Sequence, residues 1–325
     1  MAAYFLSLDP AALGRACPGG IAQGLIWGIM ALGVFLTYQM LNFADLTVDG
    51  SFATGGAVTI MLVMNGWNTE ASLIFAFLVG VVAGLITGLL HTLLGIPDIL
   101  AGILTQIALF SINLNIMGMA NRAINVNTVH PLITSNIIHS TRTILVMLAV
   151  CAIVIALLYW YLGTEQGSAI RATGINPKMS RAQGINTGRM KVITLALSNG
   201  MVALAGGILS EYQGFADVNM GRGAIVVGLA AVIIGAVLGE AIFRKRMNFV
   251  LRLSFVVVGS IIYYLVYVFV LWLKFPANDM KLLTAIVVAI FLAVPYLKQQ
   301  RQSSFSRIAK ENIKKIGRAS CRERV

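Results

Sequence analysis

The stretch "GSAIRATGINPKMSRAQGINTGRMK", residues 167–191, decides the fold of this 325-residue chain. It carries five basic residues and no acidic one, although apolar segments long enough to cross a bilayer lie on both sides of it. Asn176 followed by Pro177 is typical of a helix N-cap with proline at the first helical position. Gly184 suits the left-handed residue that follows a helix. The pattern predicts a short helix over residues 177–183, in a polar loop between two membrane spans.

The composition of the chain excludes a soluble fold. The chain is 58% hydrophobic and 11% charged, with a mean hydropathy of +0.86. Soluble domains carry about 25% charged residues, so the charges here are too few to cover a water-facing surface. The net charge is +12, but the basic residues lie in loops between apolar runs and do not form one phosphate-binding face. The sequence predicts an all-α integral membrane protein whose partner is the lipid bilayer and not nucleic acid.

Nine segments have the length and apolarity of a membrane-spanning helix, which needs about 20 apolar residues. They cover residues 20–40, 51–64, 71–94, 99–117, 143–162, 192–209, 224–243, 253–272 and 282–297. Because the second and the last are short, the predicted number of transmembrane helices is eight to ten, with nine preferred. The expected fold is a polytopic helical bundle.

Basic residues set the predicted orientation of this bundle. The loops 163–191, 244–252 and 298–315 hold five, four and six lysines and arginines. Alternating spans place all three loops on one side, and an excess of Lys and Arg marks the cytoplasmic side. Nine spans would then put the N-terminus outside.

The composition along the chain divides it into an N-terminal segment, a transmembrane domain and a C-terminal tail. Residues 1–18 form an N-terminal segment that suits a short interfacial helix, 19–297 form the transmembrane domain, and 298–315 form a basic cytoplasmic tail. The last ten residues, 316–325 (IGRASCRERV), match one in-frame translation of a common sequencing adapter and are set aside.

Several spans carry small residues at four-residue spacing, which lets helix backbones approach closely. These residues are Gly20, Gly24 and Gly28, then Gly80, Gly84 and Gly88, then Gly235 and Gly239. The pattern favours tight packing within one subunit, with a homodimer seam as the alternative.

The chain contains no motif for nucleotide or metal chemistry. It has no Gly-Lys pair and hence no phosphate loop, no HExxH zinc motif and no GxSxG nucleophile elbow. We expect no catalytic residue, no metal site and no cofactor bound by this chain.

Two polar groupings interrupt the apolar spans, in "LNFADLTVDGSFATGG" (41–56) and "ILTQIALFSINLNIMG" (103–118). Acids and amides are costly in hydrocarbon, so these side chains should face protein or a water-filled path. The candidate path residues are Asn42, Asp45, Asp49, Thr105, Gln106 and Asn113. The two acids could instead occupy a solvated turn and helix start, and the amides could bond neighbouring helices.

The motif "GSAIRATGINPKMSRAQGIN" resembles the cytoplasmic loop of ABC-importer permeases of the branched-chain amino acid and ribose class. The segments "LNFADLTVDGSFATGGA" and "GRGAIVVGLAAVIIGAVLGE" (221–240) resemble other parts of the same family. Together with "GILTQIALFSINLNIMG" they are similar to a sub-group that is encoded beside a substrate-binding lipoprotein and an ATPase and is linked to aromatic amino acids such as tryptophan. The resemblance runs from about Gly19 to Leu297. Asp45 stands where the branched-chain branch has His, which puts a branched-chain substrate in doubt.

The resemblance implies a type II-like ABC importer permease in the bacterial inner membrane. The loop 163–191 would hold the coupling helix, which sits in a cleft of a separate ATPase subunit. The matching coupling residues are Gly167, Arg171, Ala172, Asn176, Pro177, Gly184 and Ile185. ATP and Mg would be bound by that ATPase, substrate would come from a periplasmic or lipoprotein binding protein, and the permease would be a homodimer. The alternatives are an ion-coupled secondary transporter that uses Asp45 and Asp49, and a membrane scaffold without transport.

Overall fold

The computed structural model describes residues 10–124, 140–243 and 248–273, together with 282, 285, 286, 289 and 293. The chain divides into two compact units, Met1–Met280 and Lys281–Val325. All the elements below belong to the first unit. Apart from those five residues, the predicted span 282–297 lies outside the described residues, as do the predicted tail 298–315 and the segment 316–325.

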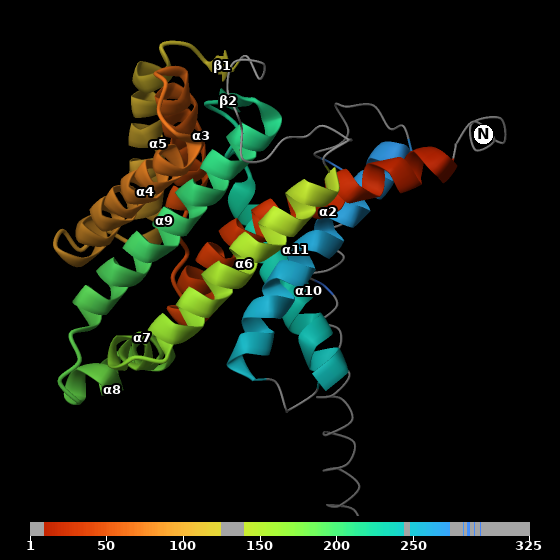
Figure 1. Cartoon of the computed structure of the whole chain (residues 1–325). Coiled ribbons are helices and arrows are strands. Elements are labelled where there is room, and N and C mark those ends of the chain that lie inside the picture. The colour runs from red at the N-terminus through yellow and green to blue at the C-terminus, as the bar shows by residue number, and fades with distance from the viewer. Residues whose placement is uncertain are drawn as a thin grey trace, which may run out of the picture. The chain divides into compact units, whose positions relative to one another are not determined.

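The described part of the first unit consists of helices, one small antiparallel sheet and the turns that connect them (Figure 1). The helices in chain order are α2 (Pro10–Phe35), continued by the π-helix η1 (Leu36–Met40), then α3 (Thr47–Met64), α4 (Thr69–Thr92), α5 (Asp98–Met117), α6 (Ser140–Leu162), α7 (Glu165–Ile175), α8 (Pro177–Ala182), α9 (Thr187–Gln213), α10 (Ala224–Phe243) and α11 (Phe249–Trp272). The strands are β1 (Asn121–Ala123) and β2 (Phe215–Asp217), with Arg122 opposite Ala216.

Among the described residues, eight helices are long and apolar enough to cross a membrane, and they coincide with the first eight predicted spans. The largest differences lie at helix starts. Helix α9 begins at Thr187 and not at 192, because the side chain of Asn186 accepts the N–H of Arg189 at 3.0 Å and caps a polar first turn. Helix α2 begins at Pro10 and continues through Pro18, so the predicted boundary after residue 18 is not a break in the helix. The interfacial position of residues 1–18 stays a prediction.

The glycine stripes pack helices of the same chain against one another. A Cβ on Gly24 of α2 would lie 2.7 Å from the Cα of Ile261 in α11. Gly80, Gly84 and Gly88 of α4 meet α9 in the same way, and Gly235 of α10 meets the backbone of α11 at Phe255. These faces are therefore covered within the chain, and the homodimer-seam alternative is wrong for them.

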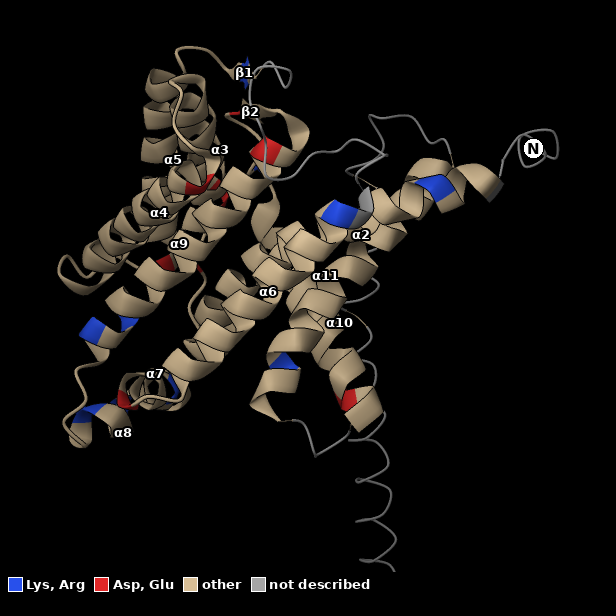
Figure 2. Ribbon diagram, in the orientation of Figure 1, with Lys and Arg blue, Asp and Glu red and all other residues tan. Residues whose placement is uncertain are grey.

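The loop that holds α7 and α8 lies at the same end of the bundle as the turns after η1 and α4 (Figure 1). A Cβ on Gly174 of α7 would overlap the carbonyl oxygen of Met40, and Gly188 lies beside Thr92. We call this end the basic side, since Lys and Arg gather on α7, α8 and the start of α9 (Figure 2). The sheet of β1 and β2 lies at the opposite end.

Candidate functional site

The loop 163–191 folds as two helices, α7 and α8, joined at a capping residue. The Asn176 side chain accepts the Met179 N–H at 3.1 Å, and Pro177 takes the first helical position. Gly184 has a φ of +84° and donates its N–H to the Arg181 carbonyl at 3.0 Å, while Ile185 donates to the carbonyl of Ser180 at 3.0 Å. The predicted short helix is confirmed and ends at Ala182, one residue early. Helix α7 was not expected.

Three contacts fix α7 to the ends of membrane spans. Gly167 packs against the backbone of Leu162 at the end of α6, and Gly174 packs against Met40 at the end of η1. The Arg171 guanidinium lies 5.8 Å from the centroid of the Phe249 ring in the first turn of α11. Arg171 was predicted as a residue that couples the loop to the ATPase. In the structure its guanidinium contacts Phe249 of the same chain. Gly174 carried no signal in the sequence, because its contact partner lies far away along the chain.

The α7–α8 junction exposes apolar side chains between basic ones. Ile175 is 86% exposed and Met179 is 58% exposed. Lys178 and Arg181 are also exposed, although the Arg181 Nε donates to the Thr187 hydroxyl at 2.8 Å. Asn176, Pro177 and Gly184 lie on this exposed part, Ala172 and Ile185 are half-buried, and Gly167 is buried. Exposed apolar side chains on a polar loop are typical of a docking surface.

Asp45 is held in a buried hydrogen-bond network just before α3. It is 2% exposed, and its carboxylate accepts the Thr47 N–H at 3.0 Å and the Asn199 Nδ2 at 2.7 Å. Burial raises the pKa of Asp45 above its ordinary value, and the hydrogen bonds from Thr47 and Asn199 offset only part of this rise. The Ser51 hydroxyl donates to the Asn199 Oδ1 at 2.7 Å and completes the network. Asn42 is exposed, with a φ of +53°, and is therefore a turn residue.

Thr105 joins helices through a short chain of hydroxyls. Its Oγ1 lies 2.9 Å from that of Thr87, which in turn lies 2.8 Å from that of Thr47. All three side chains are buried. Thr105 therefore ties α5 to α4 and α3, in line with the alternative that polar groups of this helix bond neighbouring helices.

Asp49 caps a helix that is distant in sequence. Its two carboxylate oxygens accept the N–H groups of Gly223 and Ile225, each at 2.9 Å, at the start of α10. A carboxylate at this position satisfies unpaired N–H groups and favours the positive end of the helix dipole. The non-helical residues 218–223 thus run back from β2 to the first turn of α3, and Gly221 packs on the Asp49 carbonyl. Such irregular backbone at membrane depth requires burial in protein or a water-filled cavity.

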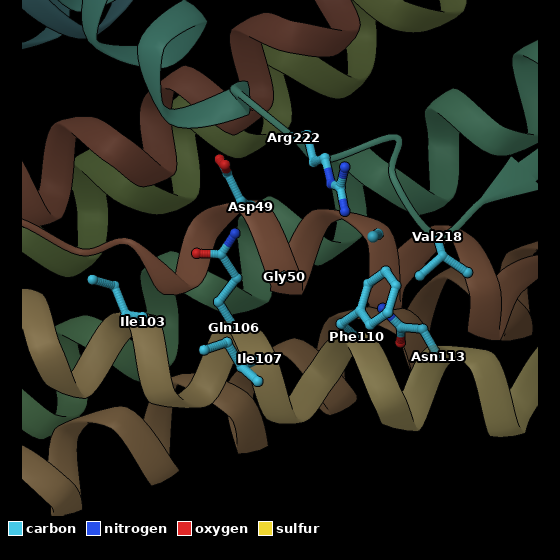
Figure 3. A pocket seen from close by; sticks show the side chains of 10 residues that line it. Asp49, Gly50, Ile103, Gln106, Ile107, Phe110, Asn113, Val218 and Arg222 are labelled. Atoms are coloured by element: carbon cyan, nitrogen blue, oxygen red, sulfur yellow. The ribbon is translucent and has the colours of Figure 1, made fainter. Parts of the chain in front are cut away.

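A cavity of about 380 Å³ lies between α3, α5 and residues 218–223 (Figure 3). It is lined in part by Asp49, Gln106, Phe110, Asn113, Val218 and Arg222. Of the six predicted path residues, the structure brings Asp49, Gln106 and Asn113 together here, while Asn42, Asp45 and Thr105 lie elsewhere. Arg222 and Phe110 were missed, because their proximity depends on the return of the chain after β2.

A bundle of apolar spans, a cavity lined by apolar and polar side chains, and an exposed basic loop are together typical of a membrane transport protein. The sequence itself contains no phosphate loop for binding a nucleotide. Residues 18–294 match the family described as "Branched-chain amino acid transport system / permease component". The chain belongs to this family and is the permease component of an ABC-type transport system in the bacterial inner membrane, a transport subunit and not an enzyme. The family resemblance drawn from the coupling loop is confirmed.

The chain is also similar to three individual proteins. The chain is 36% identical over 298 residues to a tyrosine transport system permease protein of Clostridioides difficile, covering 91% of this chain and 97% of the relative. It is 30% identical over 276 residues to an uncharacterized protein of Rickettsia prowazekii, covering 84% and 95%. It is 31% identical over 224 residues to the autoinducer 2 import system permease protein LsrC of Yersinia pestis, covering 66% and 60%. No solved structure matches the chain.

Proposed function

We propose that this permease imports an amino acid or a related small solute, and that a separate ATPase docks on the loop 163–191 to drive it. The observation that carries the docking site is the exposure of Ile175 and Met179 on a basic loop. The same loop is anchored at Leu162, Met40 and Phe249, which belong to three different spans. A displacement of α7 by closing ATPases would therefore reach α6, η1 and α11 together, as alternating access requires.

The proposal includes further partners. ATP and Mg are bound by the ATPase, a periplasmic or lipoprotein binding protein delivers the substrate, and two copies of this chain form a homodimer that matches two ATPase subunits. The substrate is an aromatic amino acid, a class supported by the relative whose name specifies tyrosine transport.

The ion-coupled alternative would require Asp45 or Asp49 to bind a cation. Both carboxylates already accept two hydrogen bonds from the protein, Asp45 from Thr47 and Asn199, and Asp49 from Gly223 and Ile225. This geometry favours structural roles for both acids. A scaffold without transport would have no use for a cavity beside α5 that carries Asp49, Gln106, Asn113 and Arg222 in its walls.

The test is uptake of radiolabelled L-tyrosine by proteoliposomes that hold the permease, the ATPase and the binding protein encoded beside it. Uptake should require internal ATP and should fall at least tenfold for Ile175→Asp, while Leu93→Asp keeps it. Leu93 is a matched control because it is 76% exposed at the basic side, in the turn between α4 and α5. Uptake that follows an ion gradient without the ATPase would contradict the proposal.

A further inference from the structure

We propose that the cavity between α3, α5 and residues 218–223 binds the substrate, with Arg222 and Asn113 holding its α-carboxylate and Phe110 packing on its aromatic side chain. This inference rests on the proposed function and assigns the residues that would recognise the substrate.

The cavity lies well inside the membrane-spanning part of α5. Phe110 is about 18 Å along the helix from Asp98 at the basic end and about 10 Å from Met117 at the other, at 1.5 Å per residue. A charged side chain at such depth is costly and marks a substrate or ion pathway unless it is paired. Arg222 lies beside Phe110 at this level, with its guanidinium 6.0 Å from the ring centroid.

Within the part of the chain that the structure describes, no acidic side chain pairs with the positive charge of Arg222. Asp49, the acid in the same cavity, directs both oxygens to the N–H groups of Gly223 and Ile225 at the start of α10. Among the described residues, Arg222 has its contact with Phe110 and no ion pair with a carboxylate. Figure 3 shows the guanidinium above the Phe110 ring, and Asp49 farther along the cavity wall. A guanidinium that pairs with none of the described carboxylates is suited to bidentate binding of a ligand carboxylate.

Asn113 supplies an independent sign of a ligand. Its side chain is fully buried, and neither its Oδ1 nor its Nδ2 has a hydrogen-bond partner among the described residues. A buried amide without partners is rare and requires an explanation such as a bound water or ligand. Because Gln106, Phe110 and Asn113 follow one another at i, i+4 and i+7, they lie on one face of α5 and all line the cavity. The amide groups of Gln106 and Asn113, which can donate and accept hydrogen bonds, thus face the same cavity as the Phe110 ring.

The remaining walls select the side chain of the ligand. Ile103, Ile107 and Phe110 form an apolar surface along α5 (Figure 3). The Phe110 ring can stack against a second aromatic ring in an offset arrangement. A volume of about 380 Å³ lies within the range of small-molecule sites. The Gln106 side-chain oxygen can accept a hydrogen bond from an ammonium group. The ligand class is therefore a zwitterionic amino acid with an aromatic side chain.

The experiment measures saturation binding of radiolabelled L-tyrosine to the purified permease–ATPase complex in nanodiscs, without the binding protein. The wild-type complex should bind saturably, Arg222→Gln should weaken binding at least tenfold and Asn113→Leu about fivefold. Arg252→Gln is the matched control, since Arg252 is exposed at the start of α11 and does not line the cavity. Phe110→Leu should reduce the preference for L-tyrosine over L-leucine. Each variant is first checked for a monodisperse complex that retains the ATPase.

Competition on the wild-type complex tests the same point without any substitution. Tyramine, which lacks the carboxylate, should compete at least tenfold more weakly than unlabelled L-tyrosine. Equal competition by tyramine, equal binding by Arg222→Gln and Arg252→Gln, or the absence of saturable binding would each overturn the inference. ATP-driven uptake with the binding protein, measured on the same preparation, shows separately whether the proposed function holds.

Discussion

The α7–α8 loop and the cavity beside α5 are built in opposite ways. The helix ends in the loop are set by residues close together in the chain, with Thr164 and Asn176 as caps and Gly184 as the left-handed terminator. The cavity is assembled from residues 49–53, 103–113 and 218–222, which meet only after the whole bundle has packed. Substitutions around the cavity should therefore affect the stability of the bundle. Substitutions in the loop should mainly affect docking of the ATPase and its coupling to transport.

The largest effect on stability is expected for Gly221→Val. A side chain at this position would overlap the backbone of Asp49 in α3, which cannot move without disturbing the helix. We expect a loss of more than about 3 kcal/mol and little monodisperse protein in detergent. Gly14→Val is the control, since nothing lies within 4 Å of a Cβ at that position. Equal thermal unfolding of the two variants would show that residues 218–223 do not pack on α3 as described.

Asp49→Ala should be the next most damaging change, because it removes two hydrogen bonds to a carboxylate at the start of α10. The expected loss is about 2–3 kcal/mol, measured by thermal unfolding of the purified permease. Asp49→Asn keeps one acceptor oxygen but turns an NH2 group toward the second backbone N–H, so it should lose part of this stability and still support ATP-driven uptake. Complete loss of uptake by a stably folded Asp49→Asn variant would instead support the ion-coupled alternative.

Asn176→Ala should cost about 1 kcal/mol, confined to α8, because the side chain caps that helix. Hydrogen exchange should become faster over residues 177–183 while the membrane spans keep their protection. Asn186→Ala is the matched control, since Asn186 caps α9 in the same way. If both variants changed exchange in α8 equally, the cap at Asn176 would not be what holds this helix.

Arg171→Ala should have the smallest effect on stability, about 0.5–1 kcal/mol, since it removes one cation–π contact with Phe249. We expect the folded permease to bind the ATPase but to transport less per ATP hydrolysed, because α7 is no longer tied to α11. Arg189→Ala, at an exposed position in the first turn of α9, is the comparison. The ratio of uptake to ATP hydrolysis in proteoliposomes is the measurement. A ratio unchanged by Arg171→Ala would contradict this role.

The same contrast explains what the sequence could and could not predict. Spans were predictable from apolar length, and α8 from the local signals at Asn176, Pro177 and Gly184. Helix α7 was not, because its glycines and small residues give it little apolar periodicity. The polar side chains in segments 41–56 and 103–118 could be singled out because polar groups are costly in hydrocarbon. The sequence could not show that Asp49 lines the cavity whereas Asp45 bonds Asn199, because this depends on how the helices pack. Arg222 could not be predicted as a cavity residue, because residues 218–223 bring it to α5 by a backbone path that no local sequence pattern indicates.

Site-specific photocrosslinking tests directly whether the ATPase docks on the α7–α8 loop. A photoreactive residue at Ile175 places the probe on the exposed α7–α8 junction, and one at Leu93 places it on an equally apolar turn of the same side. Neither change should alter the stability of the permease, since both side chains are exposed. In membranes that contain the ATPase, the proposal predicts a crosslink to that chain from position 175 and none from position 93. A crosslink from position 93 alone, or from neither position while ATP-driven uptake persists, would show that the ATPase docks elsewhere.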